Sequence, residues 1–223
     1  MSEVLPGDSL SIQSTILDTA AGLTQDFAPV KNICGFLNGF HCYADEPGTY
    51  VEENHYCSHS NEDIRQCLIY DSPERNARLI GVEYMISPKL YATLSPTERK
   101  LWHSHVFEVK SGMLIMPRPT GVPSKIWQAA EDKEMEEVIQ LYGKTFHFWQ
   151  IDKGHELPLG MPKLMGSFTE KESMPAFEKA VGDRDERFGS DWKGNMEARD
   201  YIETPDIHPD ADQANVNSKR KQL

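Results

Sequence analysis

The sequence lacks the motifs of several common enzyme and metal-binding classes. It contains no Gly-x-Ser-x-Gly nucleophile motif and no glycine-rich phosphate loop, which argues against an α/β-hydrolase and a P-loop nucleotide site. None of its 4 cysteines forms a Cys-x-x-Cys pair, which argues against a zinc ribbon and a thioredoxin-like centre. In an intracellular protein we expect free thiols at all of them, namely Cys34, Cys42, Cys57 and Cys67.

Basic residues and long apolar runs are scarce as well. The 23 basic and 35 acidic residues give a formal net charge of −12, which disfavours binding to nucleic acid. No window approaches the ~20 apolar residues of a membrane-spanning helix, and the N-terminus shows no basic region followed by an apolar run. We therefore expect a cytoplasmic protein that has no transmembrane segment and no nucleic-acid partner.

Apolar side chains alternate with polar ones in several segments, which predicts β-strands. The alternation is clearest over residues 79–87, where it places Glu83 on the face opposite Ile80 and Ile86. Residues 49–57 carry polar side chains on both faces. Such a strand is more typical of a cavity wall than of a plain apolar core.

Helical spacing of apolar residues predicts helices over residues 11–23 and 129–142. The tetrapeptide Ser95-Pro96-Thr97-Glu98 is a capping box, which predicts a helix that begins at Pro96. Together the patterns predict an α+β fold with a mainly antiparallel β-sheet, flanking helices and a disordered C-terminal tail. We expect an N-terminal helical lead, one α+β domain and an acidic, largely disordered tail over residues 1–26, 27–168 and 169–223.

Residues 101–112 contain the motif His103-Ser104-His105. If the segment is an extended strand, the two imidazoles share one face and lie a few ångströms apart. Such a pair can hold a metal ion, move a proton or simply hydrogen-bond in a half-buried sheet, and the sequence leaves these uses open. A metal site needs a third ligand from elsewhere. The preferred candidates are His41 and His55, and further ones are His59 and His147.

Glu83 and Glu108 are the carboxylates that we expect to act as a general acid or base, or as metal ligands. A glutamate in an apolar strand is costly unless it meets a cation, a histidine, a metal ion or water. In a regular strand Glu108 faces away from both histidines, unless a bulge redirects it. The alternative is a structural ion pair with Arg65, Arg78 or Lys110.

Four strings of the sequence resemble the oil-body-associated protein family, also known as domain of unknown function 1264. They are residues 55–63, 66–71, 77–84 and 101–112. The resemblance covers about residues 14–166 and is that of a fungal- or bacterial-type relative. It implies a soluble α+β protein that associates with lipid droplets, and it implies no defined catalytic set.

Two functions from different classes stay open. The first, implied by the resemblance, is peripheral association with a lipid-droplet surface or a small apolar molecule, with a histidine-lined pocket. The second is a metal-dependent enzyme that acts on a small, partly apolar metabolite, with the His103/His105 pair at its centre and Glu83 or Glu108 as acid/base. Its cofactor would be a divalent metal ion, whose identity the sequence leaves open.

Overall fold

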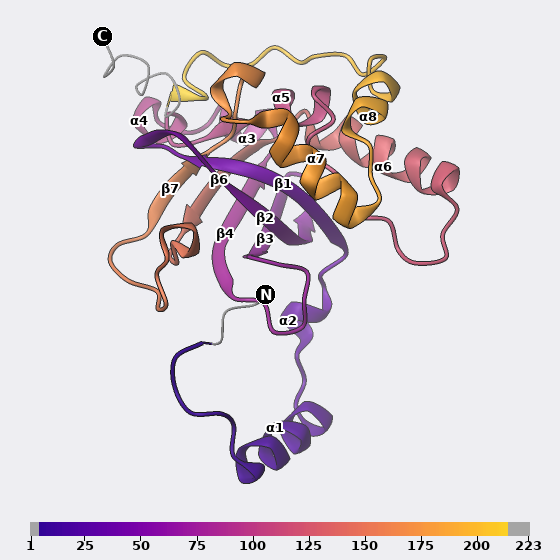
Figure 1. The fold of residues 1–223 in the computed structure, drawn as a ribbon. Helices are drawn as coiled ribbons and strands as arrows, with labels where there is room; N and C mark the ends of the chain where they lie inside the picture. The colour runs from indigo at the N-terminus through magenta and orange to yellow at the C-terminus, as the bar shows by residue number, and fades with distance from the viewer. Residues whose placement is uncertain (1–4, 214–223) are drawn as a thin grey trace.

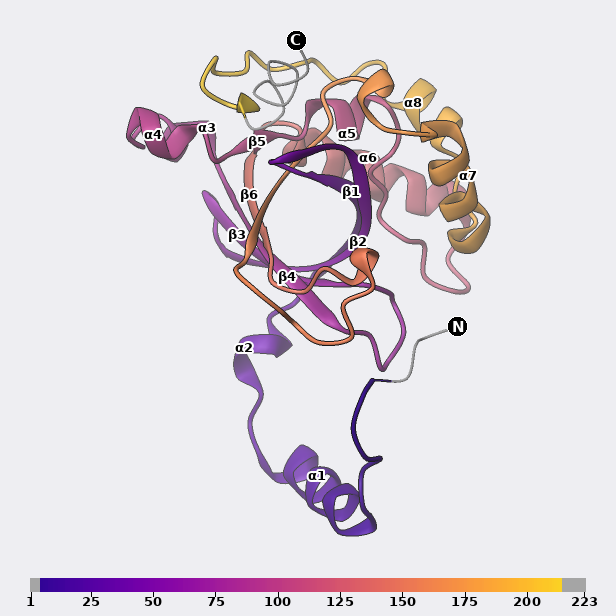
Figure 2. The same cartoon turned by 60° about the vertical axis from the view of Figure 1, so that its left-hand side comes forward.

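The computed structural model describes residues 5–213 and is built around an antiparallel sheet. The strand order is β4-β3-β2-β1-β7-β6-β5, and β4 also pairs with β6. This extra pairing closes six strands into a barrel, which Figure 1 shows from the side and Figure 2 from one end. The α+β class is confirmed, and the sheet is closed. The strands are β1 (Gly35–Tyr43), β2 (Glu46–Asn61), β3 (Ile64–Tyr70), β4 (Leu79–Ile86), β5 (His103–Ser104), β6 (Tyr142–His147) and β7 (Lys163–Gly166).

The interior of the barrel contains a polar layer between two apolar ones. Successive side chains of a strand point to opposite faces, so every second residue of β2 is directed inward, namely Val51, Glu53, His55 and Cys57. Val51 belongs to one apolar cluster, and Cys57 belongs to another. Glu53 and His55 lie between these clusters. The polar residues expected on a cavity wall therefore face the inside of the barrel.

Two short helices connect β4 to β5, and a short and a longer helix connect β5 to β6. They are α3 (Pro88–Tyr91), α4 (Pro96–Arg99), α5 (Val106–Lys110) and α6 (Ser124–Val138). The predicted N-cap and helix start are confirmed, because the backbone N–H of Glu98 donates to Ser95 Oγ at 3.3 Å and α4 begins at Pro96. The Glu98 carboxylate accepts from Trp102 Nε1 and Lys144 Nζ. The helix predicted over 129–142 begins and ends earlier, since β6 already starts at Tyr142.

The strand predicted over residues 101–112 is wrong for most of its length. Its β-structure is limited to β5, and α5 begins at Val106 with His105 as its N-cap residue. The alternation of Val, Phe and Glu in 106–109 does not distinguish strand from helix, because the segment is only one helical turn long. Val109 instead packs with Leu37, Leu114 and side chains of α6 at one end of the barrel.

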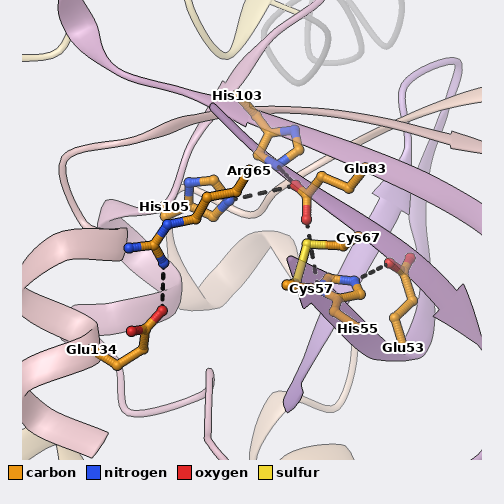
Figure 3. The surroundings of a disulfide bond; sticks show 9 residues. All are labelled: Glu53, His55, Cys57, Arg65, Cys67, Glu83, His103, His105 and Glu134. Carbon is orange, nitrogen blue, oxygen red and sulfur yellow. Dashed lines mark hydrogen bonds and ion pairs between the residues drawn. A yellow bond between two sulfur atoms is a disulfide. The ribbon is translucent and has the colours of Figure 1, made fainter. Parts of the chain in front are cut away.

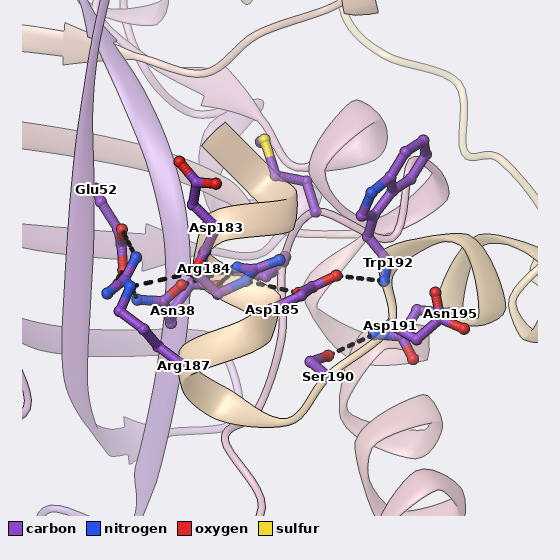
Figure 4. A network of polar contacts seen from close by, with 12 residues as sticks. Asn38, Glu52, Asp183, Arg184, Asp185, Arg187, Ser190, Asp191, Trp192 and Asn195 are labelled. Carbon is purple, nitrogen blue, oxygen red and sulfur yellow. Dashed lines mark hydrogen bonds and ion pairs between the residues drawn. The ribbon is translucent and has the colours of Figure 1, made fainter. Parts of the chain in front are cut away.

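The prediction of a disordered tail over 169–223 is wrong for residues 169–213. These residues form α7 (Phe177–Phe188) and α8 (Trp192–Ala198), which pack beside the barrel in Figure 1. Arg184 of α7 is fully buried and donates to Asn38 Oδ1 of β1 at 2.8 Å (Figure 4). Arg184 also pairs with Asp185 at 2.9 Å. Asp185 in turn accepts a hydrogen bond from the backbone N–H of Trp192. The end of the predicted tail, residues 214–223, lies outside the described residues.

The N-terminal lead contains α1 (Ile12–Thr24) and α2 (Ala28–Lys31), and neither helix has a buried residue. Helix α1 lies where the sequence predicted a helix over 11–23. Ser11 caps it by accepting from the Ser14 N–H. Among residues 5–213, no helix is long and apolar enough to cross a membrane. Two short 3-10 helices complete the fold, η1 (Ile151–Lys153) and η2 (Lys171–Ser173).

Two of the four cysteines form a disulfide, so the expectation of free thiols is wrong for them. Cys57 and Cys67 are directly opposite each other on β2 and β3, with their Cα atoms 4.0 Å apart, and their sulfur atoms are bonded (Figure 3). Outside this disulfide, Cys34 is exposed and Cys42 is buried. The sequence separation of 10 residues gave no sign of the pairing, which depends on the register of two neighbouring strands.

Candidate metal centre

Eight ionisable side chains meet inside the barrel, and each residue is at most 3% exposed. Strands β1, β2, β4, β5 and β6 and the beginning of α5 contribute them. They are His41, Glu53, His55, Glu83, His103, His105, Glu108 and His147. The structure thus brings together all six predicted site residues. It adds His147, which was a further candidate, and Glu53, which was not predicted.

Glu53 lies between three imidazoles. Its Oε2 is 2.7 Å from His41 Nδ1 and 2.8 Å from His55 Nε2. Its Oε1 is 2.8 Å from His147 Nε2. One carboxylate therefore fixes the orientation of histidines from β1, β2 and β6.

Glu83 and Glu108 lie close to the imidazoles of His41, His103 and His105. Figure 3 shows Glu83 beside His103 and His105. Glu83 Oε1 is 3.2 Å from His103 Nε2 and 3.5 Å from His105 Nε2. Glu108 Oε1 is 3.6 Å from His41 Nε2, and Glu108 Oε2 is 3.9 Å from His105 Nε2. These separations exceed ordinary hydrogen-bond lengths, except for that of His103.

His41 and His105 are each oriented through one ring nitrogen. His41 Nδ1 is held by Glu53, and His105 Nδ1 is 2.9 Å from the backbone carbonyl of Leu141. Within residues 5–213, the Nε2 atoms of His41, His103 and His105 are buried and make no hydrogen bond. Metal-binding histidines characteristically direct one nitrogen at the ion and hydrogen-bond through the other, usually to a carboxylate or a backbone carbonyl.

Two inward-facing glycines leave space for these side chains. A Cβ on Gly143 of β6 would meet the Glu83 carboxylate and would lie 2.6 Å from His103 Nε2. A Cβ on Gly81 of β4 would lie 2.7 Å from His147 Cδ2. Any larger residue at either position would displace the imidazoles.

The buried charges of the cluster shift several pKa values. Burial lowers the pKa of His103 to about 4, so its imidazole is neutral at pH 7 and can offer a lone pair. Burial also acts to lower the pKa of His41, but the Glu53 carboxylate outweighs it and raises this pKa to about 10. Burial raises the pKa of the Glu108 carboxyl. The metal-free cluster thus contains a neutral imidazole, a cationic imidazole and a carboxyl with a raised pKa. A metal ion that binds His41 Nε2 would have to displace the proton from that nitrogen.

In the described part of the chain, two sets of three residues have ligand atoms within 4.8 Å of one another, close enough to hold one ion. One is His41, Glu53 and His55, and the other is His41, Glu83 and His103. In the first set, Glu53 already hydrogen-bonds both histidines at 2.7 to 2.8 Å. In the second, Glu83 Oε1 lies 3.2 Å from His103 Nε2, but neither Glu83 nor the Nε2 atom of either histidine makes a well-oriented hydrogen bond among the described residues. The second set therefore fits a metal ion better. Glu53 fits the role of a residue that orients the ligand His41 without contacting the ion.

The alternative of structural ion pairs for Glu83 and Glu108 is wrong. Arg65 pairs with Glu134 and Glu137 on α6. Arg78 pairs with Asp71, and Lys110 donates to three backbone carbonyls near the C-terminal end of α8. Among residues 5–213, the ion-pair partners of the cluster's carboxylates are histidines, which leaves room for a bound cation to contribute charge.

Comparison with known proteins assigns the chain to a family. The profile of the family described as "Protein of unknown function (DUF1264)" matches residues 27–203. The chain belongs to this family. It is 47% identical to oil body-associated protein 1B of Arabidopsis thaliana over 207 residues, which cover 92% of this chain and 82% of the relative. It is 43% identical to oil body-associated protein 1A of Zea mays, with 92% and 83% covered. No solved structure matches the chain significantly.

These comparisons correct two details of the predicted resemblance. The relatives are plant proteins, so the expectation of a fungal- or bacterial-type relative is wrong. The family match also continues to residue 203, well beyond the predicted end near residue 166. The added part includes α7 and α8, which agrees with their packing against the barrel.

The sequence did contain a signal for each residue that was missed or misplaced. Glu53 alternates with Val51 and His55, which places it on the same inward face of β2. His105 and Glu108 are three residues apart, a spacing that brings side chains together on a helix and separates them on a strand. The expectation that Glu108 faces away is therefore wrong, because it depended on the strand.

Proposed function

We propose that the barrel binds a divalent transition-metal ion through His41 Nε2, His103 Nε2 and Glu83, with His105 Nε2 as a further ligand. The observation that supports this is a group of buried Nε2 atoms around the Glu83 carboxylate that make no well-oriented hydrogen bond among the described residues. Imidazole with carboxylate is a donor set that suits zinc, iron, manganese and related ions. Glu53 would orient the ligand His41 from the outer shell.

A bound divalent ion would act as a Lewis acid. The chain itself supplies Glu108, whose carboxyl is buried beside His41 and His105 and can retain a proton at that position. An enzymatic role for this centre would also require a metabolite to reach it. Because no residue of the cluster is more than 3% exposed, we rank metal binding above catalysis on a small, partly apolar metabolite.

Metal analysis of the untagged protein tests this proposal. We expect about one divalent ion per chain, and at least a tenfold weaker affinity in His103→Gln/His105→Gln, since three-ligand sites rarely tolerate loss of two donors. His59→Gln is the matched control, because His59 is exposed on β2. Circular dichroism confirms that each variant is folded. A folded wild-type protein that takes up neither zinc, manganese nor iron after chelation and reloading contradicts the proposal.

We also propose that the protein associates peripherally with oil bodies. The names of its relatives support this, since each is an oil body-associated protein. Association would have to occur through the protein's surface, because no helix among the described residues is able to span a membrane. Fractionation of cells that express a fluorescent fusion tests it: we expect the fusion to float with the oil bodies. A fusion found only in the soluble fraction contradicts the proposal.

A further inference from the structure

Helix α1 presents large apolar side chains to solvent. Figures 1 and 2 both show it standing away from the barrel and from α6, α7 and α8. Ile12 is 82% exposed, Ile16 63% and Leu23 83%. At about 100° per residue these three side chains lie within about 40° of one another around the helix axis. The helix therefore has an apolar stripe that the rest of the described chain does not cover.

The polar residues of α1 are nearly uncharged, and their hydroxyl groups are already satisfied. Asp18 is the single charged residue of the helix. The hydroxyls of Thr15, Thr19 and Thr24 donate to the backbone carbonyls four residues earlier, at 2.7 to 3.0 Å. A hydroxyl bonded in this way needs no water partner, so these threonines can enter an apolar interface at low cost.

The apolar surface continues from α1 into the next segment of the chain. Phe27 and Val30 are 41% and 49% exposed. Beside α2 lies a cleft of about 180 Å³ on the outer face of β2, β3 and β4. Its lining includes the apolar or aromatic side chains Val30, Ile33, Tyr56, Leu68, Val82 and Tyr84. This second feature is independent of α1 and also fits a hydrocarbon chain.

We infer that α1 and the cleft beside α2 form the surface that docks on a phospholipid-coated oil droplet with zwitterionic headgroups. This inference rests on the proposed association with oil bodies and names the part of the chain that performs it. Anionic lipids are disfavoured because the chain carries a net charge of −12 and α1 contains no basic residue. Helices with an apolar stripe and an uncharged polar face insert where headgroups are loosely packed, and the surface of an oil droplet provides such gaps.

Flotation of the full chain with artificial droplets tests this inference. The probe is triolein emulsified with phosphatidylcholine, and the variant is Ile12→Gln/Ile16→Gln. Glutamine has a slightly better helix propensity than isoleucine, so the variant keeps the helix and loses the apolar stripe. We expect its partition onto the droplets to fall about tenfold or more, given the apolar area of two isoleucines. The matched control is Ile126→Gln on α6, which removes an equally exposed isoleucine (65%) and should leave the partition unchanged.

The outcomes separate this inference from the association itself. Equal flotation of wild type and the α1 double variant overturns the role of α1, while the association stands. A wild-type protein that never floats overturns both. Stronger binding when phosphatidylserine is added overturns the choice of a zwitterionic surface. Because α1 has no buried residue, thermal unfolding of the double variant should match that of wild type, which shows that lost flotation is not lost folding.

Discussion

Glu53 is the residue on which the arrangement of the buried cluster depends. Its carboxylate oxygens contact imidazole nitrogens of His41, His55 and His147, and the side chain is fully buried. Burial alone would raise the pKa of its carboxyl, but the charges of His41 and His147 lower it well below the usual value. The Glu53–His41 pair is therefore ionised in the folded protein, and each partner stabilises the charge of the other.

This pair predicts how the stability of the metal-free protein changes with pH. The pKa of His41 rises from 6.5 to about 10 on folding, so its contribution is fully present below pH 6.5 and is lost as pH rises through about 10. In the presence of a chelator we expect the free energy of unfolding to fall by on the order of a few kcal/mol between pH 7 and 10. Urea denaturation at a series of pH values measures this.

The matched variant for that measurement is Glu53→Gln. Glu53 is the main group that raises the pKa of His41, and Glu108 and Glu83 also contribute. Without the Glu53 carboxylate this pKa is raised less, so the variant should show a smaller alkaline decline. We also expect the variant to be less stable at pH 7 by about 3 kcal/mol, because one partner of a buried ion pair has been removed. An alkaline decline of the same size in wild type and Glu53→Gln would show that the pair does not govern it.

At the scale of elements, the disulfide ties β2 to β3 next to the polar layer. Cys67 is the register partner of both Cys57 and Glu83, so the bond lies one strand from the carboxylate of the proposed centre. The bond closes a loop of only 10 residues between strands that already pair. Its main local effect is to fix the register that directs His55 and Glu83 inward.

Thiol labelling tests this pairing. In the native protein we expect rapid labelling of Cys34 alone, because Cys34 is exposed. Cys42 is buried and donates to the Gly166 carbonyl, and burial raises the pKa of its thiol to about 12. Unfolding without a reductant should add Cys42, and a reductant should then add Cys57 and Cys67. Labelling of all 4 cysteines in the unfolded protein before reduction would contradict the disulfide.

Individual elements were predictable to different degrees. The alternation around Glu83 correctly placed it inside β4, and the capping box at Ser95 correctly began α4. The segment around His105 was mistaken for a strand because a single helical turn shows no periodicity. The pairing of β4 with β6 joins residues about 60 positions apart, and no local pattern specifies such a closure.

At the scale of the whole molecule, the C-terminal segment is part of the folded domain. Its composition predicted a tail because the charged residues outnumber the apolar ones, and three of those charged residues, Arg184, Asp185 and Arg199, turn out to be buried. Arg184 bonds with Asn38 and Asp185, and Arg199 bonds with Glu131 and the Leu114 carbonyl. Composition cannot reveal such pairs, since it counts each charge as solvated.

Two arginines of α7 test whether this segment is folded onto the barrel. We expect Arg184→Met to destabilise the protein by about 3 kcal/mol, because Asp185 loses its buried partner. Arg187→Met is the control: the Arg187 side chain is 53% exposed in its pair with Glu52, so the expected loss is below about 1 kcal/mol. Thermal unfolding and limited proteolysis measure both. Equal stability of the two variants would contradict the packing of α7.

If the protein gathers at an oil surface, as we propose, the pairing of β4 with β6 has a consequence there. Each of the six barrel strands has a paired neighbour on both sides, so none of them forms an open edge of the sheet along its whole length. Open sheet edges are sites where neighbouring molecules join strand to strand, and crowding at an interface promotes such growth. On a droplet, a ring of strands would allow many copies to lie side by side without polymerising through their sheets.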